Sequence, residues 1–248
     1  MLSVIMQPTF IPWIGYFDLI DQADVFVFYD DVKITRSYWD VRNKIRDKKS
    51  DIFLTIPIKR NLPNQDLTFI NAEINYEIQW YSKHLKSLKL NYSKSKYFDE
   101  VYMVFTNVLE QKKVFLSEIN IDLIKIFSEK MGIDVTIKRT SEMGSFPATK
   151  DKKLVMICKN IDSDKYLSPI GSAAYIEKNN PGGDFPKNNI ELFYQNYKHP
   201  QYQQQYEPFI SHLSILDLLF NYGFNDSLDI IRLGRRDKIY FKDIKRYL

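Results

Sequence analysis

The chain has 248 residues, of which 44% are hydrophobic and 27% charged, and its net charge is +4. This is the composition of a globular protein, and no basic run resembles a nucleic-acid-binding arm, so we expect no nucleic-acid partner. No apolar run approaches the ~20 residues of a membrane-spanning helix, and a single cysteine, Cys158, excludes an internal disulfide. We therefore expect a cytoplasmic protein without a membrane span.

The N-terminal segment predicts a β-α-β unit. Its elements are an apolar strand at 3–6, a turn with two prolines, a short helix at 18–23 and a second apolar strand from 24. The second strand ends in two carboxylates, Asp30 and Asp31, and Gln7 follows the first strand. In open α/β sheets ligands bind beyond the carboxyl ends of the strands. These three residues are therefore expected at a ligand crevice.

Hydrophobic periodicity further along the chain predicts alternating strands and helices. Strands are expected at 52–58, 67–74, 133–137, 165–167 and 190–193. Helices are expected within 77–129, at 150–159 and at 215–222, with stops at Gly132 and Gly223. We expect an α/β fold with a Rossmann-like, mainly parallel sheet, in one domain over 1–248 with a helical lobe at about 77–131. The charged residues 234–248 would either fray or cover a partner surface.

The turn after the first strand is the most distinctive local motif. Its prolines fix φ and lack an N–H group, so the chain must leave the strand in a rigid, non-helical turn. Gly15 permits close approach of backbone or ligand, and Trp13 and Tyr16 offer an aromatic wall. A structural turn closed by Trp13 is the alternative to a ligand-binding one.

The adjacent carboxylates Asp30 and Asp31 point to opposite sides of an extended strand, so only one of them can face the crevice. That carboxylate could bind a sugar hydroxyl or act as a base, whereas a helix cap or a loop hydrogen bond is the structural alternative. No histidine stands at ligand spacing, and we expect no metal. Arg42, followed by Asn43, has the planar fork that suits a pyrophosphate or carboxylate.

Three later segments add candidates. Ser168, Gly171, Ser172 and Tyr175 belong to a loop whose free N–H groups could hold a phosphate or an oxyanion. His199, in a polar stretch shared with Tyr202 and Gln204, is the best candidate for a general base, whereas His84 and His212 are expected to be structural. Asp217 follows Ser214 at capping-box spacing, and a cap competes there with substrate binding.

The motifs resemble the WbqC-like family. The resemblance is carried by Gln7-Pro8-x-x-x-Pro12-Trp13-x-Gly15-Tyr16-Phe17, Asp30-Asp31, Arg42-Asn43, Tyr166-Leu167-Ser168, Tyr202-x-Gln204 and the stretch from Ser214 to Gly223. Members of this family often carry histidine at the position of Met6. The family is associated with O-antigen and other surface-polysaccharide gene clusters, which implies transfer of glycine or another acyl group to a sugar.

The expected function is acyl or aminoacyl transfer to the amine of a nucleotide-linked amino sugar, for example a dTDP-linked one. His199 or Asp31 would take the proton, backbone N–H groups near Gly171 would stabilise the oxyanion, and Arg42 would hold phosphates. An activated acyl donor would be the co-substrate, with no tightly bound cofactor. The expected substrate-binding residues are Gln7, Trp13, Gly15, Tyr16, Asp30, Arg42, Asn43, Ser168, Gly171, Ser172, Tyr175, Tyr202, Gln204 and Asp217.

Two alternatives stay open at this stage. An ATP-dependent amide ligase would use the same crevice, although no histidine before His84 could assist adenylyl transfer. A non-catalytic nucleotide-sugar-binding protein would need the same aromatic and basic residues but would have no turnover. The sequence leaves the oligomeric state undetermined.

Overall fold

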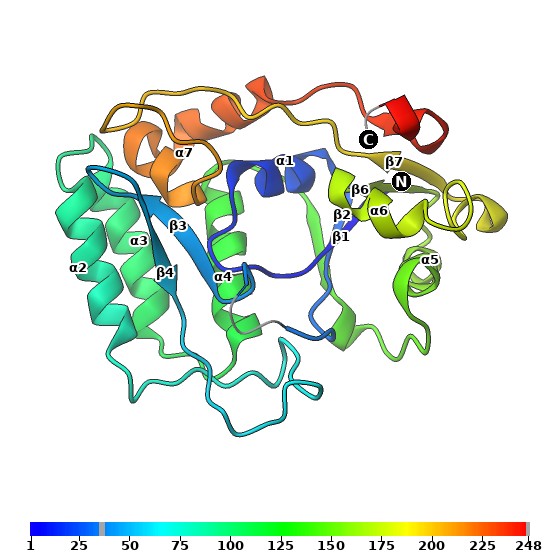
Figure 1. Ribbon diagram of the computed structural model, residues 1–248, viewed down its shortest axis with the longest axis horizontal. Coiled ribbons are helices and arrows are strands. Elements are labelled where there is room, and N and C mark those ends of the chain that lie inside the picture. The colour runs from blue at the N-terminus through cyan, green and yellow to red at the C-terminus, as the bar shows by residue number, and fades with distance from the viewer. Residues whose placement is uncertain (35–37, 247–248) are drawn as a thin grey trace.

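The computed structural model describes residues 1–34 and 38–246, which form a six-stranded sheet with helices on both faces (Figure 1). The strands are β1 (Leu2–Met6), β2 (Val25–Phe28), β5 (Thr136–Arg139), β6 (Lys165–Ser168), β7 (Glu191–Tyr194) and β8 (Ile239–Tyr240). Their order is β5-β2-β1-β6-β7-β8, and only β8 is antiparallel to its neighbour. The Rossmann-like prediction is confirmed. Strands β2 and β5 are added on one side of β1 and strands β6 to β8 on the other, so the strand order changes direction between β1 and β6.

The predicted β-α-β unit is confirmed, although its helix spans Ile14–Gln22 rather than 18–23. Parallel pairing sets Ser3 beside Val25 and Met6 beside Phe28, with α1 (Ile14–Gln22) as the crossover. Val4 and Phe26 pack in one apolar cluster, whereas their neighbours pack in another on the opposite face. Because both faces are covered, these strands read as continuous apolar runs rather than as alternating ones.

One apolar cluster joins the sheet face under α1 to the helical lobe. This cluster includes α2 (Trp80–Tyr92), α3 (Phe98–Glu110), α4 (Leu116–Lys130) and α7 (Ile215–Leu233). The second cluster lies under α5 (Lys150–Asn160) and α6 (Ala173–Ile176), and Figure 1 shows α2 and α5 at opposite ends of the molecule. The predicted stops are confirmed, since Gly132 follows α4 with φ +77° and Gly223 interrupts α7 with φ +70°.

The predicted strand at 52–58 does not belong to the central sheet. Its residues form β4 (Asp51–Thr55), which pairs antiparallel with β3 (Arg42–Arg46) in a separate two-stranded sheet. Ile45 and Leu54 face the core, whereas Phe53 faces outward and is 44% exposed. The one-sided burial suits a hairpin on the edge of the core, and sequence alternation alone could not assign it to either sheet.

The prediction of a strand at 67–74 is wrong. Within the described residues, this segment forms isolated bridges, such as Lys33 to Thr68 and Glu73 to Phe115, and no continuous strand. Leu67, Phe69 and Ala72 are nevertheless fully buried, whereas Ile70 is 39% exposed. The alternation of apolar and polar residues therefore reflects burial of alternate side chains and not pairing with a neighbouring strand.

The described part of the charged C-terminal segment, residues 234–246, forms secondary structure rather than fraying, and residues 247–248 lie outside the described part of the chain. Ile239 and Tyr240 form β8 against β7, and Phe241 and Ile244 pack in the core beneath α5. Among the described residues, no helix has the length and apolarity that a membrane crossing requires.

Candidate functional site

A cavity of about 460 Å³ opens at the carboxyl end of β1, beside the start of α1. Met6 at the end of β1, Trp13 in the β1–α1 turn and Tyr16 in α1 belong to its lining. Trp39 comes from the segment before β3, Asn43 and Lys44 come from β3 itself, and His212 comes from the loop before α7. Segments far apart in the sequence therefore meet at the edge of the sheet where ligands bind in α/β folds.

Two buried amides hold the turn that forms the cavity wall. Asn43 Nδ2 donates to the carbonyls of Phe10 and Ile11, at 3.2 and 3.0 Å. Asn120 Nδ2 donates to the carbonyl of Pro8 at 2.7 Å. Ile11 has a φ of +37°, a strained conformation that such contacts can maintain. Asn43, predicted to bind substrate, is therefore also part of the scaffold of the turn.

Trp13 is the centre of an aromatic cluster on the cavity wall. Its ring stacks on His199 at 6.0 Å, lies 5.0 Å from the ring of His212, and meets Tyr197 edge-on at 5.5 Å. Gly15 lies under the indole, where a Cβ atom would stand 2.2 Å from the ring. The group that approaches Gly15 closely is therefore the Trp13 side chain.

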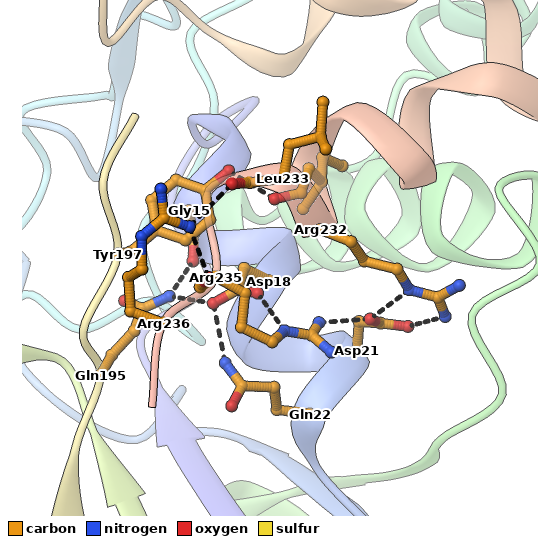
Figure 2. Close-up of polar contacts among 11 residues, drawn as sticks. Gly15, Asp18, Asp21, Gln22, Gln195, Tyr197, Arg232, Leu233, Arg235 and Arg236 are labelled. Carbon is orange, nitrogen blue, oxygen red and sulfur yellow. Dashed lines mark hydrogen bonds and ion pairs between the residues drawn. The ribbon is translucent and has the colours of Figure 1, made fainter. Parts of the chain in front are cut away.

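Figure 2 shows the polar network that holds α1 in place. Asp18, fully buried, accepts hydrogen bonds from Arg235 Nε at 2.7 Å and from Gln195 Nε2 at 2.7 Å. Gln195 Nε2 also donates to the carbonyl of Gly15 at 2.8 Å. Arg235 further pairs with Asp21, so the helix that follows Trp13 and carries Tyr16 is tied to the C-terminal segment.

His199 and His212 differ in access to the cavity. His199 Nδ1 lies 2.8 Å from the carbonyl of Pro200, its Nε2 is buried without a hydrogen-bond partner among the described residues, and burial lowers its pKa to about 4. His212 is exposed, lines the cavity, and has a pKa lowered by partial burial. Both rings are therefore neutral at pH 7, and His212 is the one that reaches the cavity.

His212 was expected to be a structural histidine, so its place in the cavity lining was not predicted from the sequence. Its position directly before the Ser214–Gly223 motif was the available signal. Trp39 and Lys44 were also missed, because membership of this cavity depends on how the hairpin packs against the β1–α1 turn.

Asp217, Tyr202 and Gln204 are brought together, but beneath the surface. The buried carboxylate of Asp217 accepts hydrogen bonds from Tyr92, Tyr202 and Gln204 at 2.8, 2.9 and 2.9 Å. Burial raises the pKa of Asp217, while these donors lower it. The cluster ties α2 and α7 to the loop that carries His199 and His212, so its place in the fold is that of a support.

The capping box expected at the start of α7 is not formed. Ser214 occupies the N-cap position, but its buried Oγ has no hydrogen-bond partner among the described residues. The carboxylate of Asp217 is engaged by the tyrosines instead.

The two adjacent carboxylates have different surroundings. Asp30 is fully buried and accepts hydrogen bonds from Arg139, Thr140 and Ser141. Asp31 has a side chain 23% exposed, and it pairs with Lys153 at 2.7 Å and with Thr140 at 2.7 Å. Asp31 is therefore the more accessible member of the pair, although a cation already neutralises it.

A second, smaller hollow of about 230 Å³ lies toward α5. Tyr29, Lys150, Leu154 and Tyr175 line it. Ser168 ends β6, and Gly171 and Ser172 form a single 3₁₀ turn that leads into α6, where Tyr175 lies. The predicted loop and Tyr175 thus belong to this hollow's surroundings rather than to the lining of the Trp13 cavity.

Gln7 and Arg42 do not line the Trp13 cavity. Gln7 directly follows β1, and its carbonyl accepts a hydrogen bond from the Tyr16 hydroxyl at 2.9 Å. The Arg42 guanidinium lies 4.4 Å from the ring centre of Phe53 on the outer face of the hairpin. Among the residues described, no group of three histidine, cysteine or acidic side chains could hold a metal ion. Cys158 is buried, and burial raises its pKa to about 12.

Comparison with known proteins gives one family and one similar relative. The sequence model of the WbqC-like protein family matches residues 7–228. The chain is 28% identical over 234 residues to the uncharacterized protein Rv1507c of Mycobacterium tuberculosis, a match that covers 94% of this chain and 98% of that protein. No solved structure matches the chain.

Proposed function

The chain belongs to the WbqC-like protein family, and on that premise we propose that it is an acyl or aminoacyl transferase. Its acceptor would be the amine of a nucleotide-linked amino sugar used in O-antigen or surface-polysaccharide biosynthesis. The observation that carries the proposal is a neutral histidine, His212, beside Trp13 in a cavity of about 460 Å³. Aromatic walls with a few polar groups suit a sugar ring, which packs its C–H faces on aromatic rings.

His212 supplies the base in this proposal. Because its pKa is lowered, the ring is neutral near pH 7 and can accept a proton from the acceptor ammonium. Nδ1 lies 2.9 Å from Ser211 Oγ, which leaves Nε2 for the substrate. His199, the base expected from sequence, packs behind Trp13 and contributes by holding the indole in place.

The reaction forms one bond and breaks one. The deprotonated amine attacks the acyl carbonyl, a C–N bond forms, and the bond from that carbon to the donor's leaving group breaks. The second amine proton leaves with the departing group. Lys44, on the cavity lining, is the cation available to the developing oxyanion, although it also pairs with Asp51 at 2.6 Å.

A mass-shift assay tests the proposal. Purified protein is incubated with nucleotide-linked amino sugars and activated acyl donors, with and without ATP, and products are read by mass spectrometry. We expect amide formation without ATP, and a loss of rate of ~10²–10⁴-fold in His212→Ala with a modest change in acceptor affinity. Thr9→Ser, a conservative change at another residue of the cavity lining, is the matched control.

Three outcomes would contradict the proposal. An absolute requirement for ATP would favour an amide ligase. Binding of the nucleotide-sugar without any product would favour a non-catalytic binding protein. A large rate loss in Asp31→Asn with none in His212→Ala would move the base to the carboxylate beside Lys153.

A further inference from the structure

The outer face of the β3–β4 hairpin carries an unusual set of side chains. Antiparallel pairing sets Lys44 directly opposite Phe53, and Arg42, two residues before Lys44, projects on the same side. The alternate residues, such as Ile45 and Leu54, face the core and are buried. The hairpin therefore presents two cations and one aromatic ring away from the core.

Two further aromatic residues extend this surface. Tyr38, Trp39 and Phe53 are 58%, 37% and 44% exposed, and together we call them the aromatic ledge. The rings of Tyr38 and Trp39 are 6.1 Å apart, and those of Trp39 and Phe53 are 6.0 Å apart. A contiguous exposed apolar surface of this kind marks a binding site more often than a single exposed ring does.

The ledge is continuous with the cavity. Trp39 and Lys44 line the cavity that also contains Trp13 and His212, so a ligand seated there can extend onto the ledge. An aromatic ring, a cation and the cavity adjoin here, as the base, the diphosphate and the sugar adjoin in a nucleotide-sugar.

The two cations beside the aromatic ledge, Lys44 and Arg42, differ in whether a carboxylate compensates their charge. Lys44 Nζ is 2.6 Å from Asp51, so its charge is largely compensated. The Arg42 guanidinium stacks 4.4 Å from the ring centre of Phe53 and has no carboxylate partner among the described residues. A guanidinium held flat on a ring keeps its N–H edge available, and this edge suits the paired oxygens of a diphosphate.

We propose that the aromatic ledge binds the nucleoside diphosphate portion of the substrate. The base stacks on Trp39 with Tyr38 at its edge, Arg42 binds the diphosphate, and the sugar enters the cavity. This assignment rests on the proposed function for its choice of a nucleotide-sugar, and it adds where the nucleotide lies. Stacking on aromatic rings tolerates different bases, so the ledge itself accepts either pyrimidine diphosphate tested below.

Calorimetric titration with dTDP and UDP tests the ledge without requiring turnover. We expect wild-type protein to bind both, and Trp39→Ala to weaken binding about 5- to 150-fold, the range of one stacking contact. Arg42→Gln should weaken it about 10- to 100-fold through loss of charge-assisted hydrogen bonds. Leu90→Ala, on an exposed residue of α2, is the matched control and should bind as the wild type does.

The variants are expected to fold, because the altered side chains are partly exposed, and equal thermal midpoints verify this. Tyr38→Ala, at the most exposed ring of the ledge, provides a second variant in case Trp39→Ala is unstable. Unchanged dTDP affinity in Trp39→Ala, Tyr38→Ala and Arg42→Gln overturns the proposal. Ledge-dependent binding to vesicles of anionic phospholipid, with no binding of dTDP, also overturns it and indicates a membrane surface.

The two proposals can fail separately. If dTDP binds through the ledge but no acyl transfer is found, the ledge stands and the transferase proposal fails. If acyl transfer occurs and the KM for the nucleotide-sugar is the same in all three ledge variants, the transferase proposal stands and the ledge fails.

Discussion

The indole of Trp13 covers Gly15 so closely that a methyl group added at Gly15 would lie 2.2 Å from the Trp13 ring. Trp13 is the N-cap residue just before α1 and Gly15 lies in its first turn, and the Trp13 ring forms a wall of the cavity. The absence of a side chain at Gly15 therefore sets the shape of the candidate site.

Gly15→Ala should move Trp13 without unfolding the protein. The ring's far edge makes the contact and can swing outward, and alanine recovers up to about 1 kcal/mol of helix propensity. We expect a change in the free energy of unfolding below about 2 kcal/mol, together with a shift in tryptophan emission and weaker binding in the cavity. Gly171→Ala, where no atom lies within 4 Å of the added methyl, is the control. An unchanged emission spectrum would contradict the prediction.

Asp30→Asn should destabilise the protein far more than Asp31→Asn. Asp30 is fully buried and pairs with Arg139, and breaking a buried pair typically costs about 3–5 kcal/mol. Asp31 is partly exposed, so we expect a loss of about 1–2 kcal/mol. Urea unfolding of both variants measures the difference, and equal losses would count against the distinction.

Tyr92→Phe should destabilise the support beneath the histidine loop. The Tyr92 hydroxyl donates to Asp217 and accepts the backbone N–H of Arg46 at 2.7 Å, so two buried groups lose a partner. We expect a loss of about 2–4 kcal/mol. The pKa of Asp217, already raised by burial, rises further, so the loss should increase as pH rises from 4 to 7.

Tyr102→Phe, on the partly exposed face of α3, is the control for Tyr92→Phe and should change stability little. Denaturant unfolding at both pH values provides the measurement. A destabilisation that is independent of pH would show that the Asp217 carboxylate does not respond to its tyrosine donors.

His84 should make stability fall on acidification. Burial lowers its pKa to about 4, so between that value and the ordinary 6.5 the unfolded chain takes up a proton that the folded protein does not. Stability is therefore present above pH 6.5 and is lost as pH falls, by up to about 3 kcal/mol. In His84→Gln, which can still accept the Thr55 N–H, the loss between pH 6.5 and 4 should be smaller by that amount. Identical pH profiles for the two proteins would refute this.

The rate of the proposed acyl transfer should also depend on pH, through the protonation of His212. The pKa of His212 is lowered, so the base is deprotonated above about 6.5, the ordinary histidine value. We expect kcat/KM to be flat above this pH and to fall only at lower pH. A fall that begins above pH 7 would indicate a group with a raised pKa instead.

Local sequence patterns determined much of the fold. The β1–α1–β2 unit, the helices between residues 80 and 130, and the breaks at Gly132 and Gly223 were all predictable. In each case the signal lies within one element, as apolar periodicity, proline-restricted φ or the conformational freedom of glycine. The family resemblance, which the match over residues 7–228 confirms, was carried by the same local motifs.

Tertiary structure alone decided which polar residues face a cavity. Asp30 and Asp31 are neighbours, yet Arg139, Thr140 and Lys153, all more than 100 positions away, determine that one is buried and the other partly exposed. In the same way, contacts with Trp13 place His212 in the cavity and His199 behind the indole. Burial and hydrogen-bond saturation arise between segments far apart in the chain, so no local pattern of residues encodes them.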